Sequence, residues 1–286
     1  STLLQRHMTI WEAIVLGLVQ GITEFLPISS TAHLIISAHL LNLHFSGLGM
    51  EITLHLASAL AVTCYFRRDL WRILCGALCF MRNRAPAHRS SFFICIYLGV
   101  ATVVTGVLGI VATKVLGDSI RSPKLMGGGL LVTAFFLIAI ERFHHYGKRG
   151  EGAITGVDAV LVGIGQALAV LPGISRAGST LITALYLGLE RETAVRFSFL
   201  LAIPVILGST VLAVKDLQGG LLSDIGALPM LLAFMTTFAA SLAGIYWLIA
   251  FLRSGRLLYF AIYCVIVGIF CITMLSPADI PAEVLP

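Results

Sequence analysis

Two polar, helix-breaking motifs interrupt apolar segments in the two halves of this chain. The first is QGITEFLPISSTAH at residues 20–33, and the second is QALAVLPGISRAGST at residues 166–180. Gln20 and Gln166 are 146 positions apart, as are Glu12 and Asp158. Broken helices at matching positions of two halves are the sequence sign of a binding site near the bilayer midplane. The repeat therefore predicts a membrane protein in which each half contributes one tip to a central site.

The composition agrees with a membrane protein. Of the 286 residues, 58% are hydrophobic and only 12% are charged, with a mean hydropathy of +0.97, whereas soluble domains carry roughly 25% charged residues. The net charge is +5. The basic residues gather in a few loops, which fits orientation in a bilayer, so no nucleic-acid partner is expected. The six cysteines have no Cys-x-x-Cys spacing and are interpreted as buried hydrophobic residues.

Six membrane-spanning helices are predicted from apolar runs near the length of about 20 residues that crosses a bilayer. They are residues 48–66, 91–115, 125–140, 197–214, 229–251 and 257–275. The positive-inside rule assigns the loops with basic clusters to the cytoplasm; these clusters are Arg67/Arg68/Arg72, Arg82/Arg84/Arg89, Arg142/Lys148/Arg149 and Arg253/Arg256. Segment 70–81 then has two cytoplasmic flanks and is predicted to lie in the membrane interface.

The two motif regions, residues 9–43 and 155–189, must each begin and end on one side of the membrane. We therefore predict two re-entrant helical hairpins that enter from opposite faces and meet near the centre. Each half is a hairpin followed by three spans, an odd number that inverts the second copy. The predicted fold is one all-α integral membrane domain built as an inverted-topology repeat of residues about 9–141 and about 155–275. Both termini are expected outside, and residues 1–7 are interpreted as an expression remnant.

The first tip gathers groups that could carry out chemistry. Pro27 ends one half-helix, and the next is expected to start with its N-terminal N–H groups directed at the tip; its candidate N-caps are Ser29, Ser30 and Thr31. His33 lies three residues after Ser30 and Glu24 four after Gln20, so each pair shares a helix face. A hydroxyl nucleophile, an imidazole and a carboxylate would lie in one compact site.

The second tip adds a permanent positive charge. Pro172 and Gly173 break the helix, and Ser175 can cap the next one. The Arg176 guanidinium suits phosphate oxygens better than an ammonium group does. Gly173 and Gly178 allow close backbone approach. Two facing helix N-termini plus an arginine favour an anion site, and the neighbouring acid–base groups make phosphoryl transfer the leading reaction class.

Several of these residues also have a purely structural interpretation. A Ser or Thr in a membrane helix is usually a packing residue that bonds its own backbone, which applies to Ser29, Thr31, Ser179 and Thr180. Glu24 and Arg176 could form an ion pair that only joins the two halves, although charged groups inside a membrane are usually functional. Glu51 and His55 either support the site or are polar groups at the end of a span. His144 and His145 are interpreted as solvated loop residues.

The two motifs closely resemble the signature motifs of the bacterial undecaprenyl-diphosphatase family, which is linked to bacitracin resistance. The similarity in motif order and hydropathy extends from Ile10 to about Leu275. The resemblance implies hydrolysis of undecaprenyl diphosphate to undecaprenyl phosphate and inorganic phosphate, which regenerates the lipid carrier for peptidoglycan synthesis. It also implies a divalent cation, Mg²⁺ or Ca²⁺, and a site on the external face of the inner membrane.

Residue roles follow from the resemblance position by position. Ser30 would be the nucleophile, His33 the acid–base group, Glu24 a metal ligand or base, and Arg176 the diphosphate-binding group. The further substrate contacts would be Gln20, Ser29, Thr31, Gly173, Ser175 and Thr180. The family has Glu or Gln at the first motif position, and a glutamine is a poor Mg²⁺ ligand. Glu24 would therefore hold the metal largely alone, with Gln20 or Glu51 as additional ligands.

The sequence leaves three questions open. Ser30 either forms a phosphoseryl intermediate or only binds the phosphate while His33 or Glu24 activates water. An alternative function is a secondary transporter or flippase of an anionic lipid, because broken helices in inverted repeats are a transporter architecture. Membrane lipids surround the chain in either case, and a homodimer is one assembly that stays open.

Overall fold

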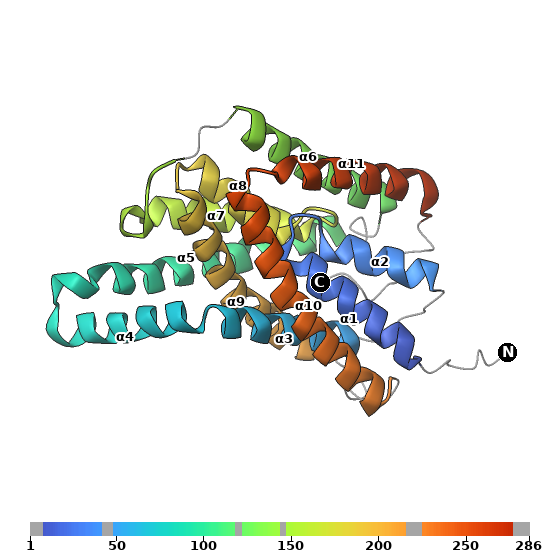
Figure 1. The fold of residues 1–286 in the computed structure, drawn as a ribbon, viewed down its shortest axis with the longest axis horizontal. Coiled ribbons are helices and arrows are strands. Elements are labelled where there is room, and N and C mark those ends of the chain that lie inside the picture. Colours follow the sequence, from blue (N-terminus) through green and yellow to red (C-terminus); the bar gives the residue numbers. More distant parts are fainter. Residues whose placement is uncertain (1–7, 42–47, 118–121, 144–146, 216–224, 277–286) are drawn as a thin grey trace.

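A computed structural model describes residues 8–41, 48–117, 122–143, 147–215 and 225–276. Residues 1–7, the end of the first predicted hairpin at 42–43, and His144 and His145 lie outside these ranges. The described residues form eleven α-helices and no β-strand. Figure 1 shows them as one helical assembly. The helices are α1 (Ile10–Phe25), α2 (Ser30–Leu40), α3 (Leu48–Tyr65), α4 (Arg67–Asn83), α5 (Arg89–Leu116), α6 (Pro123–Phe143), α7 (Gly156–Ala167), α8 (Arg176–Tyr186), α9 (Arg191–Lys215), α10 (Ala227–Arg253) and α11 (Leu257–Met274).

Five helices are long and apolar enough to cross a membrane: α5, α6, α9, α10 and α11. They correspond to five of the six predicted spans. Helix α3, the sixth, meets this standard only together with α4, from which it is bent by 73° at a short break. The described residues therefore form an all-α membrane protein with five candidate spanning helices, or six if α3 and α4 form one broken span. The predicted interfacial segment 70–81 lies within α4, and its position at the membrane surface stays a prediction.

Both predicted hairpins are helical, and both begin with the same local device. Thr9 caps α1 and exchanges hydrogen bonds with Glu12, and Thr155 caps α7 and does the same with Asp158. Such capping boxes satisfy two backbone N–H groups that the first helical turn leaves free. The two pairs are 146 positions apart in the sequence, and the same capping contact is formed at both.

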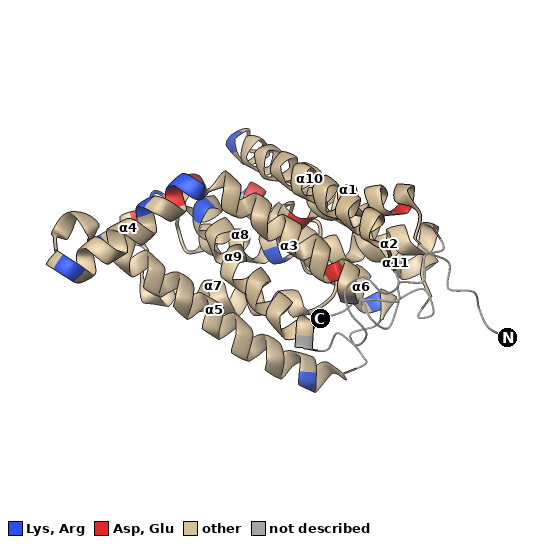
Figure 2. Cartoon of the chain, turned by 90° about the horizontal axis from the view of Figure 1, so that it is seen from below, with Lys and Arg blue, Asp and Glu red and all other residues tan. Residues whose placement is uncertain are grey.

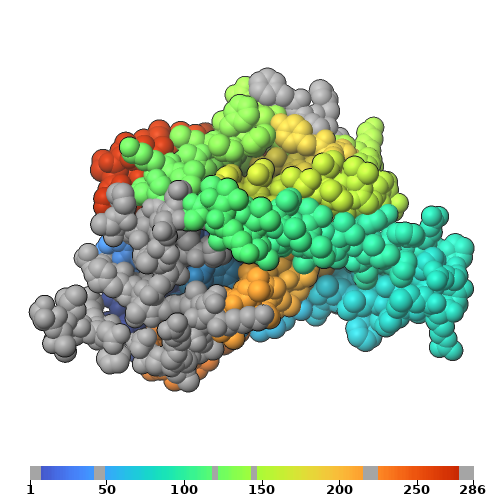
Figure 3. Space-filling view, turned by 180° about the vertical axis from the view of Figure 1, so that it is seen from behind, coloured from blue at the N-terminus to red at the C-terminus, as the bar shows by residue number. Residues whose placement is uncertain are grey.

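Helices of one half pack closely on helices of the other. Helix α1 lies against α10, and α7 lies against α5; Figure 3 shows α5 and α7 side by side across the rear face. A Cβ atom added at Gly21 would lie 2.6 Å from Ala240 Cβ, and one added at Gly163 would lie 2.8 Å from the Ala101 carbonyl oxygen. Small residues permit such close backbone approach between membrane helices. The glycines of α1 and α7 therefore set how the two halves interlock.

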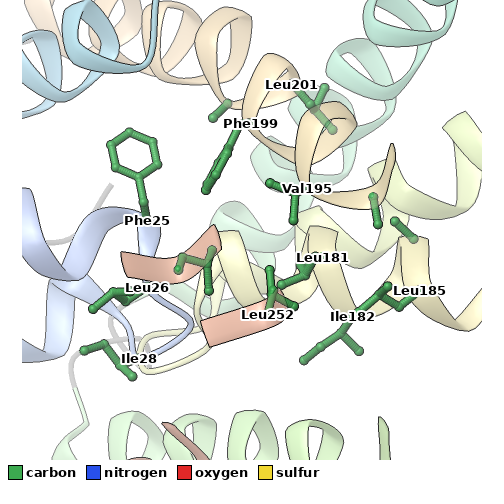
Figure 4. Close-up of a cluster of buried hydrophobic side chains, with 14 of the residues drawn as sticks. Phe25, Leu26, Ile28, Leu181, Ile182, Leu185, Val195, Phe199, Leu201 and Leu252 are labelled. Atoms are coloured by element: carbon green, nitrogen blue, oxygen red, sulfur yellow. The ribbon is translucent and has the colours of Figure 1, made fainter. Parts of the chain in front are cut away.

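The largest apolar core surrounds the hairpin tips. Figure 4 shows Phe25, Leu26 and Ile28 from the first tip near Leu181 and Ile182 of α8. Phe25 and Phe199 of α9 meet edge to face with ring centroids 5.5 Å apart. Two of the six cysteines, Cys264 and Cys271, are buried as expected, whereas Cys79 is exposed. This core packs the first tip against α9 through Phe25 and Phe199.

Charged residues are sparse along the helices and gather near α4 and the helix ends (Figure 2). One network joins α4 to the second half of the chain. Arg72 bonds both oxygens of Glu151 at 2.7 Å. Arg196 of α9 lies 3.1 Å from Glu151 and 3.3 Å from Asp69. Networks of this kind are more stabilising than single exposed ion pairs, because each charge has more than one partner.

Candidate active site

The first tip is a tight turn between α1 and α2. Helix α1 ends at Phe25, Pro27 lies in the turn, and α2 starts at Ser30. The predicted capping role of Ser29 is only half right: it occupies the N-cap position, but its side chain makes no capping hydrogen bond. Its φ of 66° is in the left-handed region, where a non-glycine residue is strained. Such strain persists only where the surroundings enforce it, and it is concentrated at functional sites.

Glu24 is the centre of the polar cluster at this tip. One carboxylate oxygen, Oε2, accepts hydrogen bonds from Ser30 Oγ at 2.7 Å and from Gln20 Nε2 at 2.9 Å. The other oxygen, Oε1, accepts from Arg176 Nη2 at 2.7 Å. The Glu24 side chain is only 3% exposed, against 19% for Arg176. The carboxylate therefore joins a serine, an amide and a guanidinium from both motifs.

The second tip touches the first directly. Ser175 caps α8 as predicted, accepting from Gly178 N at 3.1 Å. Its hydroxyl also donates to the Leu26 carbonyl of the first tip at 3.3 Å. A Cβ atom added at Gly178 would lie 3.2 Å from Pro27 Cβ. The tips of the two hairpins are thus in contact, and Arg176, the first residue of α8, reaches Glu24 across that contact.

Two predicted substrate contacts, Gly173 and Thr180, have other structural partners. Gly173 has φ 87°, and a Cβ atom added there would overlap the Met126 carbonyl oxygen of α6, so a side chain would clash. Thr180 is buried and donates to the backbone carbonyls of Arg176 and Ala177. Thr31 is half-buried in the first turn of α2. The packing of Gly173 and Thr180 accounts for these residue types, and their contact with substrate stays a prediction, as it does for Thr31.

His33 departs from the expected arrangement with Ser30. The two residues share the first turns of α2, as predicted, but the imidazole bonds elsewhere. Nδ1 lies 2.7 Å from the Ser29 carbonyl oxygen, and Nε2 lies 2.7 Å from the Tyr263 hydroxyl on α11. Because both ring nitrogens are engaged, the Ser30 proton is directed to Glu24 instead. Sequence reasoning missed Tyr263, since a tyrosine in an apolar span has no signal that separates it from packing residues.

The residues near Glu24 can accommodate a hard cation. Gln20 Oε1 is buried and has no hydrogen-bond partner, and amide and carboxylate oxygens are ligands that Ca²⁺ accepts. Glu51 and His55 of α3 lie near enough for their charges to interact with Glu24, although the His55 ring bonds the Glu51 backbone carbonyl at 3.0 Å. Among the described residues, no three His, Cys, Asp or Glu side chains converge. A cation here would therefore depend on substrate oxygens or water for most of its ligands.

The helices and the polar centre define a multi-pass, all-α membrane protein with a hydroxyl, a carboxylate and a guanidinium joined at two touching helix tips. The family model described as "Bacitracin resistance protein BacA" matches residues 13–270. The chain belongs to this family.

Its relatives agree with that assignment over nearly the whole chain. It is 51% identical to undecaprenyl-diphosphatase 2 of Halalkalibacterium halodurans over 264 residues, which is 92% of this chain and 95% of the relative. It is 49% identical to undecaprenyl-diphosphatase 1 of Shouchella clausii, with the same two coverages. Undecaprenyl-diphosphatase 3 of Bacillus anthracis is 38% identical over 95% of this chain and its own full length.

Proposed function

We propose that this protein is a membrane phosphatase that hydrolyses undecaprenyl diphosphate to undecaprenyl phosphate and inorganic phosphate. The family and the names of its relatives support the reaction and the polyprenyl diphosphate substrate. One structural observation carries the assignment to a site: Glu24 bonds the Ser30 hydroxyl with one oxygen and the Arg176 guanidinium with the other. Transport of an anionic lipid needs no hydroxyl–carboxylate pair, so the alternative of a secondary transporter is not favoured.

Glu24 acts as the base in this proposal. The Ser30 proton already points at Glu24 Oε2 across 2.7 Å, within the range expected of a general base. Ser30 Oγ attacks the terminal phosphorus, the new Oγ–P bond forms, and the bond from that phosphorus to the bridging oxygen breaks. Undecaprenyl phosphate leaves with the electron pair, and Glu24 holds the proton. Water then attacks the phosphoserine phosphorus and the P–Oγ bond breaks. Ser30 Oγ recovers the proton held by Glu24, phosphate is released, and the proton lost by water passes to the solvent. Direct attack by water activated by Glu24 is the second route, in which Ser30 only binds phosphate.

Arg176 and the helix ends bind the charge of the diphosphate. The guanidinium has donors beyond the one that bonds Glu24, and a planar fork suits phosphate oxygens. Helices α2 and α8 both start at the tips, so their free N–H groups and positive dipole ends face the same region. These groups stabilise charge that builds up in the transition state. Ser29 and Ser175 lie in the same two turns and complete the predicted phosphate environment.

A divalent cation, Mg²⁺ or Ca²⁺, is the proposed cofactor. Glu24 and the unpartnered Gln20 Oε1 would hold it, with Glu51 as a further carboxylate from α3. Mg²⁺ sites commonly use one or two carboxylates plus substrate phosphates, so a sparse protein ligand set is sufficient. When bound, the ion would neutralise phosphate charge and polarise the reacting group.

We also propose that the two halves form an inverted repeat in a bacterial inner membrane, with the site open to the exterior. Two observations support related halves. The capping boxes of α1 and α7 lie at matching positions of the two halves, and a helix of each half packs on a helix of the other, α1 on α10 and α7 on α5. The basic loops support a cytoplasmic face opposite the site. The contacts described above lie within one chain, so the homodimer stays a prediction.

The test is phosphate release from undecaprenyl diphosphate by purified protein in detergent, with and without a chelator. Wild type should release phosphate without any membrane and should lose activity with the chelator. Ser30→Ala should lose most activity and carry no label after a single turnover with terminally labelled substrate. Transport without hydrolysis by the wild type would overturn the proposal. Unlabelled wild type together with an active Ser30→Ala variant would leave only direct water attack.

A further inference from the structure

Helix α11 supports the first tip from outside both motifs. Tyr263 bonds His33, and the neighbouring Cys264 donates its thiol proton to the Pro27 carbonyl oxygen at 3.4 Å. Cys264 is fully buried there. The two consecutive residues therefore contact the turn before α2 and the first turns of α2 itself. In Figure 1, α11 lies beside α6 at the top of the molecule.

The hydrogen bonds of His33 determine its proton positions. The Ser29 carbonyl can only accept, so Nδ1 carries a proton and donates it across 2.7 Å. In the neutral ring, Nε2 then has a free lone pair, and the Tyr263 hydroxyl donates to it across 2.7 Å. The Nε2 lone pair is therefore engaged by Tyr263, whereas the Ser30 hydroxyl donates to Glu24 Oε2.

The ring of Tyr263 also fixes the plane of the imidazole. The two rings are stacked with centroids 5.5 Å apart and an angle of 13° between their planes. A ring held by two hydrogen bonds and one stacking contact has little freedom to rotate. The imidazole is thus held on the helix face it shares with Ser30, beside the N-terminus of α2 where the proposed phosphate binds. Orientation of a histidine by a hydrogen bond to its second nitrogen is a general device of catalytic sites.

We propose that Tyr263 is a positioning residue of the phosphatase site, which acts by holding His33 through Nε2. The inference rests on the proposed function and deepens it, since it adds a residue that neither motif contains. Loss of the hydroxyl frees Nε2 and lets the imidazole turn. His33, the acid–base group that the family resemblance predicts, then spends less time beside Ser30 and the proposed phosphate site, while the diphosphate contacts of Arg176 are unchanged. The expected result is a loss in kcat with little change in KM.

The experiment compares Tyr263→Phe with Tyr259→Phe in phosphate release from undecaprenyl diphosphate. Tyr263→Phe should lower kcat about tenfold, as expected for one functional hydrogen bond, with KM within about twofold of wild type. Tyr259 lies one turn earlier on α11 and packs on Phe251, so its variant should match wild type. Incorporation of p-aminophenylalanine at 263 restores a ring-borne N–H donor and should recover most of the lost rate.

A double-mutant cycle separates positioning of His33 from a general packing effect. In a His33→Ala background, Tyr263→Phe should have no further effect, because the partner through which Tyr263 acts is gone. Equal rates for wild type and Tyr263→Phe would overturn the inference. An undiminished Tyr263→Phe effect in the His33→Ala background, or no rescue by p-aminophenylalanine, would do the same. Absence of phosphate release by wild type would instead refute the proposed function.

Discussion

The Glu24 carboxylate and the Arg176 guanidinium, 152 positions apart in the chain, lie 2.7 Å apart where the two hairpin tips touch. The same carboxylate accepts a hydrogen bond from the Ser30 hydroxyl at 2.7 Å. A purely structural ion pair would explain the first bond but not the second. The pair therefore links the halves, and its carboxylate also contacts the Ser30 hydroxyl, the proposed nucleophile.

Replacement of Arg176 by lysine tests the role of the guanidinium fork. Arg176→Lys keeps the charge but loses the planar set of donors, so activity should fall at least about tenfold, equivalent to about 1.4 kcal/mol. The measurement is kcat/KM for phosphate release. Arg253→Lys, an exposed change at the end of α10, is the matched control and should be silent. Near-normal turnover of Arg176→Lys would show that its charge alone is enough.

Replacement of Glu24 by glutamine tests the assignment of the base. Glu24→Gln keeps the size and one accepting oxygen but cannot take a proton, so kcat should fall about 10²–10⁴-fold. The folded state is checked by melting in detergent. The control is Glu192→Gln. The Glu192 side chain is 71% exposed and pairs with Arg196 one helical turn away, so this variant should retain full activity. A Glu24→Gln protein with more than a third of wild-type kcat would point to His33 as the base.

Replacement of Gln20 by glutamate tests the proposed cation site. Gln20→Glu adds a second carboxylate beside Glu24, so half-maximal activity should require less Mg²⁺ or Ca²⁺. The measurement is phosphate release across a metal titration. Gln166→Glu is the control, because Gln166 occupies the matching position in the second half and bonds Thr105 at 3.0 Å. That variant should be less stable and show no gain in metal affinity. An equal metal requirement in Gln20→Glu and wild type would place the cation elsewhere.

The ion-pair network of Glu151 predicts how stability changes with pH. Burial favours the neutral acid, but hydrogen bonds and charge from Arg72 and Arg196 outweigh it and hold the pKa of Glu151 below its ordinary value of 4.5. A lowered folded-state pKa stabilises the protein above about pH 4.5, and this contribution is lost as pH falls through the folded-state value. Glu151→Gln should therefore melt earlier than wild type at pH 7, and this difference should shrink as the pH is lowered from 5 towards 3, as followed by thermal melting.

The control for this prediction is Glu192→Gln, which removes an exposed member of the same network. Its melting curve should follow wild type at every pH. A Glu151→Gln difference that is constant from pH 7 to 3 would mean that the side chain acts through packing instead of charge.

Replacement of Gly173 tests why the second tip needs a glycine. Gly173→Ala places a Cβ against the Met126 carbonyl and forces φ 87° on an alanine, so the protein should lose about 1–3 kcal/mol of stability. Gly208→Ala in α9 has open space around the new methyl group and should be neutral or slightly stabilising. Melting in detergent measures both. If Gly173→Ala melts like wild type but loses activity, the glycine instead serves the substrate.

Local features of the tips could be predicted from the sequence because they depend on residues within one or two helical turns of each other along the chain. The break at Pro27, the start of α2 at Ser30, the Ser175 cap and the Gln20–Glu24 pair all follow from such short-range rules. The hydrogen-bond partner of His33 could not be predicted from the sequence. The Ser30–His33 pair was expected from their spacing, but spacing places two side chains on one face without deciding which atoms bond. Tyr263, 230 positions away, occupies the nitrogen that this expectation required.

The sequence by itself determined that the chain is an all-helical membrane protein and that its two repeated motifs carry the polar chemistry. Hydropathy, helix breaks and caps are local properties, and they are encoded within short segments. Only the tertiary structure decided that the Ser30 hydroxyl donates a hydrogen bond to Glu24, that Gly173 faces α6, and that α11 contacts His33. Those outcomes depend on close approach of helices from different parts of the chain, where small residues such as Gly21 and Gly163 set the distances at which side chains from distant segments can meet.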